Sequence, residues 1–154
     1  RELDQYPYKQ KLSEDSSSEL HDGSIMIIVA TDAPLNPRNL DRMAMRSMMG
    51  LARTGSYASN GSGDYVIAFS TNKKSRKPRN SNKPVESLSL VNSSMSPIFA
   101  ATAEATEEAI YNAIFKATSI KSSRGSREAI PIDKLMQVLE KYNALYWDSL
   151  SSEN

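Results

Sequence analysis

The sequence predicts a mixed fold of strands and helices, in the α+β class, and three observations support this prediction. Two short runs of apolar and β-branched residues, at 25–30 and 65–69, are typical of strands buried on both faces. Elsewhere apolar residues recur three or four positions apart, which is typical of amphipathic helices. A third stretch, 97–118, is rich in alanine, the residue with the highest helix propensity.

The first 22 residues precede these elements and are polar and acidic. They surround a serine tract at 16–18 and contain few apolar side chains. Such a composition buries too little apolar surface to offset the entropy lost on ordering, so we expect a flexible tail or linker. Asp22-Gly23 then signals a turn directly before the first strand.

The first predicted helix has recognisable start and stop signals. Asn36 is a typical N-cap with Pro37 at the first helical position, and Gly55 is a typical terminator. Its apolar face is expected to contain Leu40, Met43, Ala44, Met48 and Leu51. Its solvated stripe is expected to contain Arg38, Arg42 and Arg46. The methionines at 43, 45, 48 and 49 fit an adaptable binding face or core packing, and core packing is the expected use.

The second predicted strand is followed by a basic segment at 73–83. Six lysines and arginines lie there without an acidic residue, a pattern that fits nucleic-acid contact or a solvated loop. A solvated loop is expected, because no aromatic residue interleaves the basic ones and the whole chain carries a net charge of only +1. Residues 85–91 predict a further strand.

The alanine-rich helix is expected to open at Ser96-Pro97 and to end near Thr118. Seven alanines in it would let a neighbouring element approach closely. Glu104, Glu107 and Glu108 fit acid–base chemistry or metal binding, but a solvated face is the expected use. A loop at 121–127 precedes a final helix, and residues 149–154 are expected to fray. One face of that helix contains Ile132, Leu135, Met136, Leu139 and Tyr142.

Composition excludes several kinds of site. The chain has no cysteine and one histidine, His21, so disulfide scaffolds, thiol nucleophiles, iron–sulfur clusters and Cys- or His-rich zinc sites are excluded. A Ser-His-Asp triad would have to use a histidine from the predicted tail. No apolar run is long enough to span a membrane. No targeting segment is visible, and the sequence does not decide between cytoplasm and periplasm.

Two glycine-serine turns stand directly before the predicted strands. Gly23-Ser24 precedes the first and Gly61-Ser62-Gly63-Asp64 precedes the second. Each places a hydroxyl at the mouth of a sheet, where glycine lets backbone and ligand come close. Taken alone, each turn is more typical of structure than of catalysis.

Several segments, taken in order, resemble the β subunit of DmpA- and BapA-type self-processing serine aminopeptidases, the L-aminopeptidase/D-esterase and β-aminopeptidase family. They span nearly all of residues 22–142. They are GSIMIIVATDAPL at 23–35, GLARTG at 50–55, GSGDYVIAF at 61–69, ATEEAI at 105–110, NA at 112–113 and AIP at 129–131.

The resemblance implies self-cleavage at the Gly23-Ser24 bond. The Ser24 hydroxyl would attack the preceding carbonyl, and hydrolysis of the resulting ester would free an α-amine on Ser24. Such an amine has an unperturbed pKa of about 8 and can act as the base beside the nucleophile. By position, Ser62 would hydrogen-bond the nucleophile and Asp64 would hold the amine. Some family members have Glu where this chain has Asp64.

The resemblance also implies a four-layer αββα sandwich of the N-terminal-nucleophile type, of which this chain supplies only part. Residues 1–23 would be the tail of a larger α subunit, and 24–154 would be the β subunit. The α subunit would supply the oxyanion-stabilising Asn and much of the pocket, and αβ units would form a homo-oligomer. Substrates would be peptides or aminoacyl amides and esters. Neither a metal nor an organic cofactor is implied, and neither nucleic acid nor membrane is an expected partner.

Two alternatives remain at this point. An acyltransferase of the ornithine acetyltransferase kind has a similar fold and cleaves itself, but it uses a Thr nucleophile, and Ser24 argues against it. A catalytically degenerate interaction module would bind through the basic 73–83 segment. Preference between α- and β-amino acids, and between L and D stereochemistry, depends on pocket residues mostly outside this chain.

Overall fold

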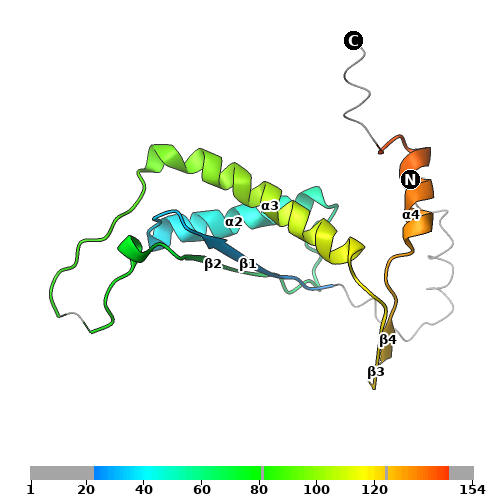
Figure 1. Ribbon diagram of the computed structural model, residues 1–154, viewed down its shortest axis with the longest axis horizontal. Helices are drawn as coiled ribbons and strands as arrows, with labels where there is room; N and C mark the ends of the chain where they lie inside the picture. Colours follow the sequence, from blue (N-terminus) through cyan, green and yellow to red (C-terminus); the bar gives the residue numbers. More distant parts are fainter. Residues whose placement is uncertain (1–22, 81, 124, 146–154) are drawn as a thin grey trace, which may run out of the picture.

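The computed structural model describes residues 23–80, 82–123 and 125–145, and Figure 1 shows them as a mixture of strands and helices. The predictions for the 1–22 tail, for His21 and for 149–154 lie outside these residues. In chain order the elements are β1 (Met26–Thr31), α2 (Pro37–Arg53), β2 (Tyr65–Ser70), the 3-10 turns η2 (Lys73–Ser75) and η3 (Asn92–Ser94), α3 (Met95–Phe115), β3 (Ile120–Ser122), β4 (Gly125–Arg127) and α4 (Ile132–Lys141).

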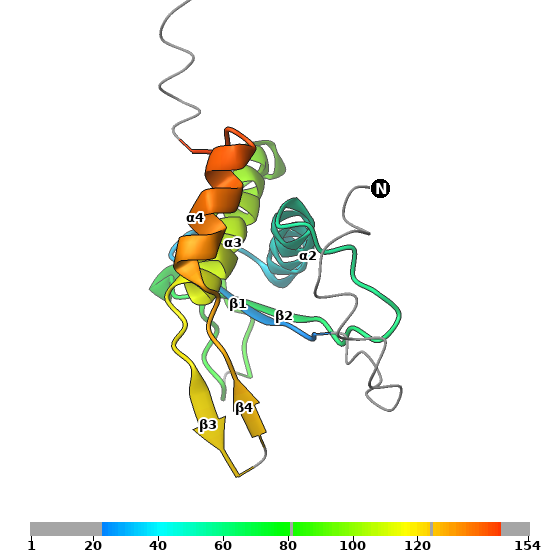
Figure 2. The same cartoon turned by 90° about the vertical axis from the view of Figure 1, so that its right-hand side faces the viewer.

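The strands β1 and β2 form a parallel pair, and α2 and α3 cover one face of it (Figures 1 and 2). Met26 lies opposite Tyr65 and Thr31 opposite Ser70. Parallel strands need a crossover, and α2 supplies it. The predicted signals of α2 are confirmed: the Asn36 side chain accepts a hydrogen bond from the Asn39 amide at 2.9 Å.

The core lies between this sheet and the two helices. Leu35, Met43 and Met95 are buried at its centre. Half-buried residues packed around them are Val29, Ala33, Leu40, Ala68, Leu90, Ile98 and Phe99. Core packing is therefore confirmed for Met43, whereas Met45 and Met49 are exposed. The expected solvated stripe is wrong in part, because Arg42 and Arg46 are half-buried and stack over the ring of Phe99.

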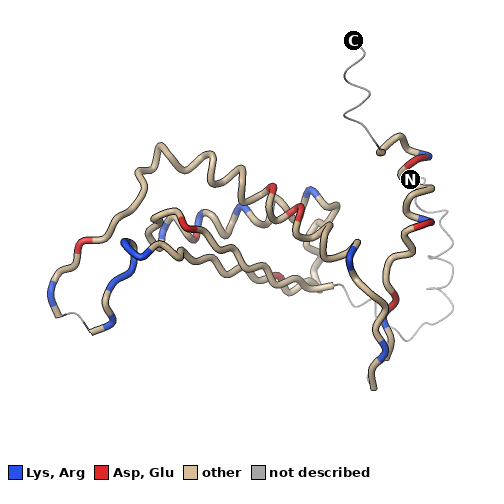
Figure 3. Tube along the Cα trace, viewed as in Figure 1, with Lys and Arg blue, Asp and Glu red and all other residues tan. Residues whose placement is uncertain are grey.

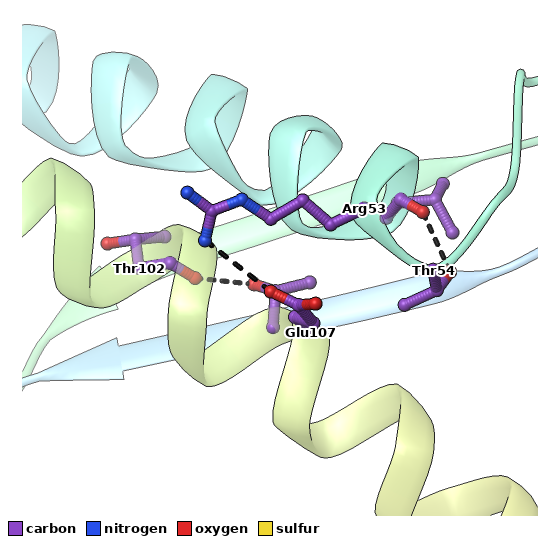
Figure 4. A network of polar contacts seen from close by, with 6 residues as sticks. Arg53, Thr54, Thr102 and Glu107 are labelled. Carbon is purple, nitrogen blue, oxygen red and sulfur yellow. Dashed lines mark hydrogen bonds and ion pairs between the residues drawn. The ribbon is translucent and has the colours of Figure 1, made fainter. Parts of the chain in front are cut away.

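The helices α2 and α3 approach closely where both present small residues. A Cβ added at Gly50 would lie 2.4 Å from the carbonyl oxygen of Ala103 and 2.7 Å from Cβ of Thr106. The predicted close approach to the alanine-rich helix is thus confirmed. At the edge of this contact, Arg53 of α2 reaches Glu107 of α3 at 3.4 Å (Figure 4). The hydroxyl of Ser47, also on α2, is buried and has no hydrogen-bond partner among the described residues.

Two predicted segments differ from the structure. The strand expected at 85–91 is wrong: Leu88 and Leu90 donate their amides to the carbonyls of Lys74 and Pro34, so this segment hydrogen-bonds to the turn η2 and to the loop before α2 instead of to a strand. The loop expected at 121–127 is a short antiparallel hairpin, β3–β4. Its turn is closed by Gly125, whose φ of +126° suits glycine alone.

The second face of the β1–β2 sheet is not covered by the described residues. Side chains alternate along both strands, and Met26, Ile28, Tyr65, Ile67 and Phe69 are exposed. The prediction that both strands are buried on both faces is therefore wrong for the described part of the chain, which supplies only one layer of covering helices. We call this exposed apolar surface the open face.

The last described segment leaves the layered part of the molecule. In Figures 1 and 2, β3, β4 and α4 extend beyond the end of α3. The predicted final helix is confirmed as α4, but none of its residues is buried. Across the described residues, no helix combines the length and the apolarity that crossing a membrane would require.

Candidate active site

The parallel pairing of β1 and β2 brings the first residues of both strands together at one end of the sheet. Ser24 lies two residues before β1, and the 61–64 turn ends directly before β2. The three residues predicted as catalytic, Ser24, Ser62 and Asp64, are therefore neighbours in space, although Ser62 and Asp64 lie 38 and 40 positions after Ser24 in the sequence.

A hydrogen-bond network joins the two turns. The Gly63 amide donates to Oγ of Ser24 at 3.0 Å, and the Ser62 hydroxyl lies 2.9 Å from the carbonyl oxygen of Gly23. Oδ1 of Asp64 lies 2.6 Å from Oγ of Ser62 and accepts from the Ile25 amide at 3.2 Å. The turn at 62–64 thus contacts both sides of the Gly23–Ser24 peptide bond.

The contacts that Ser62 and Gly63 make differ from those that the resemblance implied. In the described residues, the hydrogen bond to Oγ of Ser24 comes from the backbone amide of Gly63, while the Ser62 hydroxyl contacts the carbonyl oxygen of Gly23. Sequence reasoning did not single out the Gly63 amide as a donor, because every residue except proline has one. Its only signal was the glycine itself, which leaves space beside Ser24: an added Cβ would meet Oγ of Ser24 at 3.4 Å.

Ser24 lies at one end of a cavity of about 770 Å³. Ser24 is exposed, whereas Ser62, Gly63 and Asp64 are half-buried behind it. The cavity follows β1 beneath α3, and its walls are mostly apolar. It is lined by residues 23–30 and by Thr102, Ala105, Thr106, Ala109, Ile110, Ala113 and Ile114. Ser24 is therefore accessible both from solvent and from this cavity.

The other residues singled out from the sequence lie elsewhere. The basic 73–83 segment follows the end of β2, at the opposite end of the sheet from Ser24, and its described basic residues are exposed (Figure 3). Glu104 and Glu108 are exposed, and Glu107 pairs with Arg53. No cluster of three or more acidic, histidine or cysteine side chains that could hold a metal ion occurs in the part of the chain that the structure describes.

Comparison with known proteins identifies similar chains. The model of peptidase family S58 matches residues 2–128. The β-peptidyl aminopeptidase BapA of Sphingosinicella microcystinivorans is 38% identical over 125 residues, which cover 80% of this chain and 31% of that protein. BapA of Sphingosinicella xenopeptidilytica is 34% identical over 121 residues, covering 76% and 29%. The chain thus spans about a third of the length of these relatives.

Solved structures give the same picture. A Pyrococcus horikoshii OT3 protein superimposes with a TM-score of 0.68 at 44% identity, covering 76% of this chain and 33% of that one. The L-aminopeptidase D-Ala-esterase/amidase of Ochrobactrum anthropi, described as a prototype serine aminopeptidase with a variant of the Ntn hydrolase fold, gives 0.64 at 27% identity, again over 76% and 33%. The predicted fold class, α+β of the N-terminal-nucleophile type with this chain supplying only part, is therefore confirmed.

Proposed function

This chain belongs to peptidase family S58, and we propose that it carries the nucleophile of a self-processing N-terminal serine aminopeptidase. Residues 24–154 would form the β subunit, and 1–23 the end of a larger α subunit of the same precursor. The observation that carries the proposal is the contact between the two turns: Gly63 and Ser62 hydrogen-bond to the oxygen atoms on either side of the Gly23–Ser24 bond.

In the proposed mature enzyme, Ser24 supplies both nucleophile and base. Its α-amine, with an unperturbed pKa of about 8, takes the proton of the Ser24 hydroxyl as that oxygen attacks the substrate carbonyl. The Gly63 amide positions the attacking oxygen. Asp64, whose carboxylate already accepts a backbone amide next to Ser24, would hold the new ammonium group. Water then hydrolyses the acyl-Ser24 ester, and none of these steps calls on a metal or an organic cofactor.

The proposed larger subunit has two surfaces of this chain to cover. One is the open face of the sheet, where Met26 is 71% and Ile28 67% exposed. The other is the outer edge of β1. Because Ile25 and Thr31 accept amides from the β2 side, the backbone groups of the alternate residues Met26, Ile28 and Ala30 point away from β2. Apolar area and unpaired strand edges of this extent mark interfaces.

The proposed substrates are peptides and aminoacyl amides or esters, from which the enzyme would release the N-terminal amino acid. The relatives' names support this class, since they describe a β-peptidyl aminopeptidase and an L-aminopeptidase D-Ala-esterase/amidase. The apolar cavity beside Ser24 suits the hydrocarbon part of such a substrate. We propose further that αβ units assemble into a homo-oligomer.

Intact mass of the freshly purified full-length precursor tests the proposal. We expect the wild type to yield two fragments, the smaller beginning at Ser24, and to hydrolyse aminoacyl nitroanilides. Ser24→Ala is expected to stay full length and to be inactive, because it lacks the attacking oxygen. The kcat/KM of the mature wild type should rise with pH as the Ser24 ammonium loses its proton, and the midpoint of this rise should lie at a pH of about 8. A wild type that stays intact and inactive would contradict the proposal.

A further inference from the structure

The residues that follow β2 present a group of exposed cations. Lys73, Lys74, Arg76, Lys77 and Arg79 are all exposed, and none of these five forms an ion pair with a described residue. In Figure 3 their segment lies at the end of the molecule opposite the β3–β4 hairpin. The sequence 73–91 contains only one acidic residue, so this segment is strongly positive.

Hydrogen bonds fix the turn from which these cations project. The side-chain amide of Asn72 donates to the carbonyl of Asp32 at 2.9 Å, and its oxygen accepts the amide of Lys74 at 3.0 Å. The guanidinium of Arg76 donates to the carbonyl of Thr71 at 3.2 Å. Because the backbone is already held, less conformational freedom is lost when the segment binds a partner.

Exposed apolar side chains lie directly beside this turn. The amide of Leu88 donates to the carbonyl of Lys74 at 3.1 Å, and the carbonyl of Leu88 accepts the hydroxyl of Ser75 at 3.0 Å. The side chain of Leu88 is nevertheless 51% exposed, and those of Val85 and Val91 are 38% and 64% exposed. We call these three apolar residues and the five basic residues the basic–apolar surface.

We propose that the basic–apolar surface adsorbs to an anionic lipid bilayer. Anionic headgroups attract clusters of about four to eight lysines and arginines. Aliphatic side chains beside such a cluster gain further by entering the boundary between headgroups and acyl chains. The family resemblance implied no membrane partner, so this inference goes beyond it. It is also independent of the reaction proposed for Ser24.

Nucleic acid is the other polyanion that could contact these cations, and the composition of the segment favours lipid. Proteins that bind single strands interleave aromatic side chains, on which bases stack, with basic ones. The sequence 71–94 contains no aromatic residue. Phosphate groups offer nothing to Val85, Leu88 and Val91, whereas a bilayer offers both an anionic surface and an apolar interior.

The position of the surface is compatible with an active enzyme. The basic–apolar surface follows the end of β2, whereas Ser24 precedes the start of β1, and the two strands are parallel. Adsorption therefore uses the end of the sheet opposite the candidate active site. Hydrolysis of a small soluble substrate should proceed at the same rate with and without vesicles.

Vesicle sedimentation of the full-length precursor tests the proposal. One set of vesicles is pure phosphatidylcholine, and the other also contains phosphatidylserine. We expect binding to the anionic vesicles only, with a progressive loss as salt screens the attraction. Replacing the five basic residues of the surface with glutamine should weaken binding by more than about 10²-fold, because each contributes a factor of about five.

Leu88→Ser tests the apolar part separately, because it leaves the charge unchanged. It should weaken binding to the anionic vesicles by about three- to tenfold, the scale of partly burying one leucine side chain. Unchanged binding of this variant would overturn the assignment to a bilayer, since charge alone would then account for adsorption.

A second variant with five glutamines is the matched control. It removes the same number of exposed basic residues from outside the basic–apolar surface, and it should bind within about fivefold of the wild type. These residues are Lys116, Lys121, Arg127, Lys134 and Lys141. Thermal midpoints show that each variant retains its fold.

Three further results would overturn the proposal. Equal losses in the two five-glutamine variants would mean that only net charge matters. Absence of wild-type binding to anionic vesicles would mean that another part of the protein covers the surface. Tighter binding to a single-stranded DNA oligonucleotide, unaffected by Leu88→Ser, would identify nucleic acid as the partner. None of these measurements requires self-cleavage, so failure of the proposed function would leave the result intact.

Discussion

The layered unit, residues 23–115, and the arm, residues 116–145, use their apolar residues differently. The layered unit encloses Leu35, Met43 and Met95 between one sheet face and two helices. The arm has an equally clear apolar stripe along α4, yet Ile132, Met136 and Tyr142 are exposed and no α4 residue is buried. An amphipathic helix forms stably only when its stripe is covered. The layered unit is thus partly self-supporting, while α4 depends on a surface outside the described residues.

The same contrast recurs within the layered unit, between the two faces of its sheet. Val29 and Ala68 pack against the core on the helix side, whereas Ile28 and Ile67 are exposed on the open face. The candidate active site lies at the end of the sheet where β1 and β2 begin. Ser24 and the 62–64 turn are positioned by the pairing of β1 and β2, which this chain makes by itself.

A pair of methionine substitutions tests this contrast most strongly. Met43 is 1% exposed and Met136 is 42% exposed. Met43→Ala leaves a cavity in the core and should lower the free energy of unfolding by about 2–5 kcal/mol. Met136→Ala should change it by less than about 0.5 kcal/mol in this chain alone. Urea unfolding followed by circular dichroism measures both, and an equal cost at the two positions would contradict the difference between unit and arm.

Gly50→Ala probes the tightest contact of the layered unit. At an ordinary interior helix position this change stabilises, because alanine has the higher helix propensity. Here the added Cβ would collide with backbone and side chain of α3, so the helices must separate at a cost of about 1–3 kcal/mol. The sign of the shift in thermal midpoint shows whether the collision outweighs the gain in helix propensity. A more stable variant would mean that α2 and α3 pack more loosely than described.

Ser47→Ala should stabilise the protein, by about 1 kcal/mol. The buried Ser47 hydroxyl has no hydrogen-bond partner in the part of the chain that the structure describes, and removing an unsatisfied polar group relieves its desolvation cost. Ser70→Ala provides the opposite case, because the Ser70 hydroxyl donates to the Ala33 carbonyl and its loss should destabilise. Denaturant midpoints of the two variants should therefore move in opposite directions, and a parallel shift would contradict this explanation.

The smallest effect is expected at the rim of the layered unit. Arg53 and Glu107 are 51% and 28% exposed, and water screens their attraction. Glu107→Gln should cost less than about 0.5 kcal/mol at low salt, and nothing measurable at 1 M salt, where charges are screened within about 3 Å. A cost that persists at high salt would show that the rim resembles the core more than the arm.

Local signals in the sequence were sufficient to predict the main helices and the two strands of the layered unit. Asn36, Pro37 and Gly55 marked the ends of α2 because capping depends on neighbouring residues alone. The open face was not predictable in the same way, since an apolar strand shows that both sides are to be covered but not which chain covers them. The β3–β4 hairpin was missed because IKS and GSR lack the alternation of apolar and polar residues that marks a strand.

The candidate site shows the same limit. Ser24, Ser62 and Asp64 could be named from the family resemblance, whereas their turns alone favoured a structural use, and the structure places the three residues together. Which group contacts which oxygen was not readable from the sequence, since it depends on the register of β1 against β2. The Gly63 donor, being a backbone group, has no side-chain signature at all.

The outer edge of β1, which no described residue pairs with, also has a consequence for how the protein can be produced. An exposed strand edge beside apolar residues is a template on which further strands add, which is the usual start of edge-to-edge aggregation. Copies of this chain that lack a covering surface should therefore be lost to inclusion bodies or to proteolysis. Production of soluble protein would then depend on synthesis of the covering surface at the same time and in the same amount.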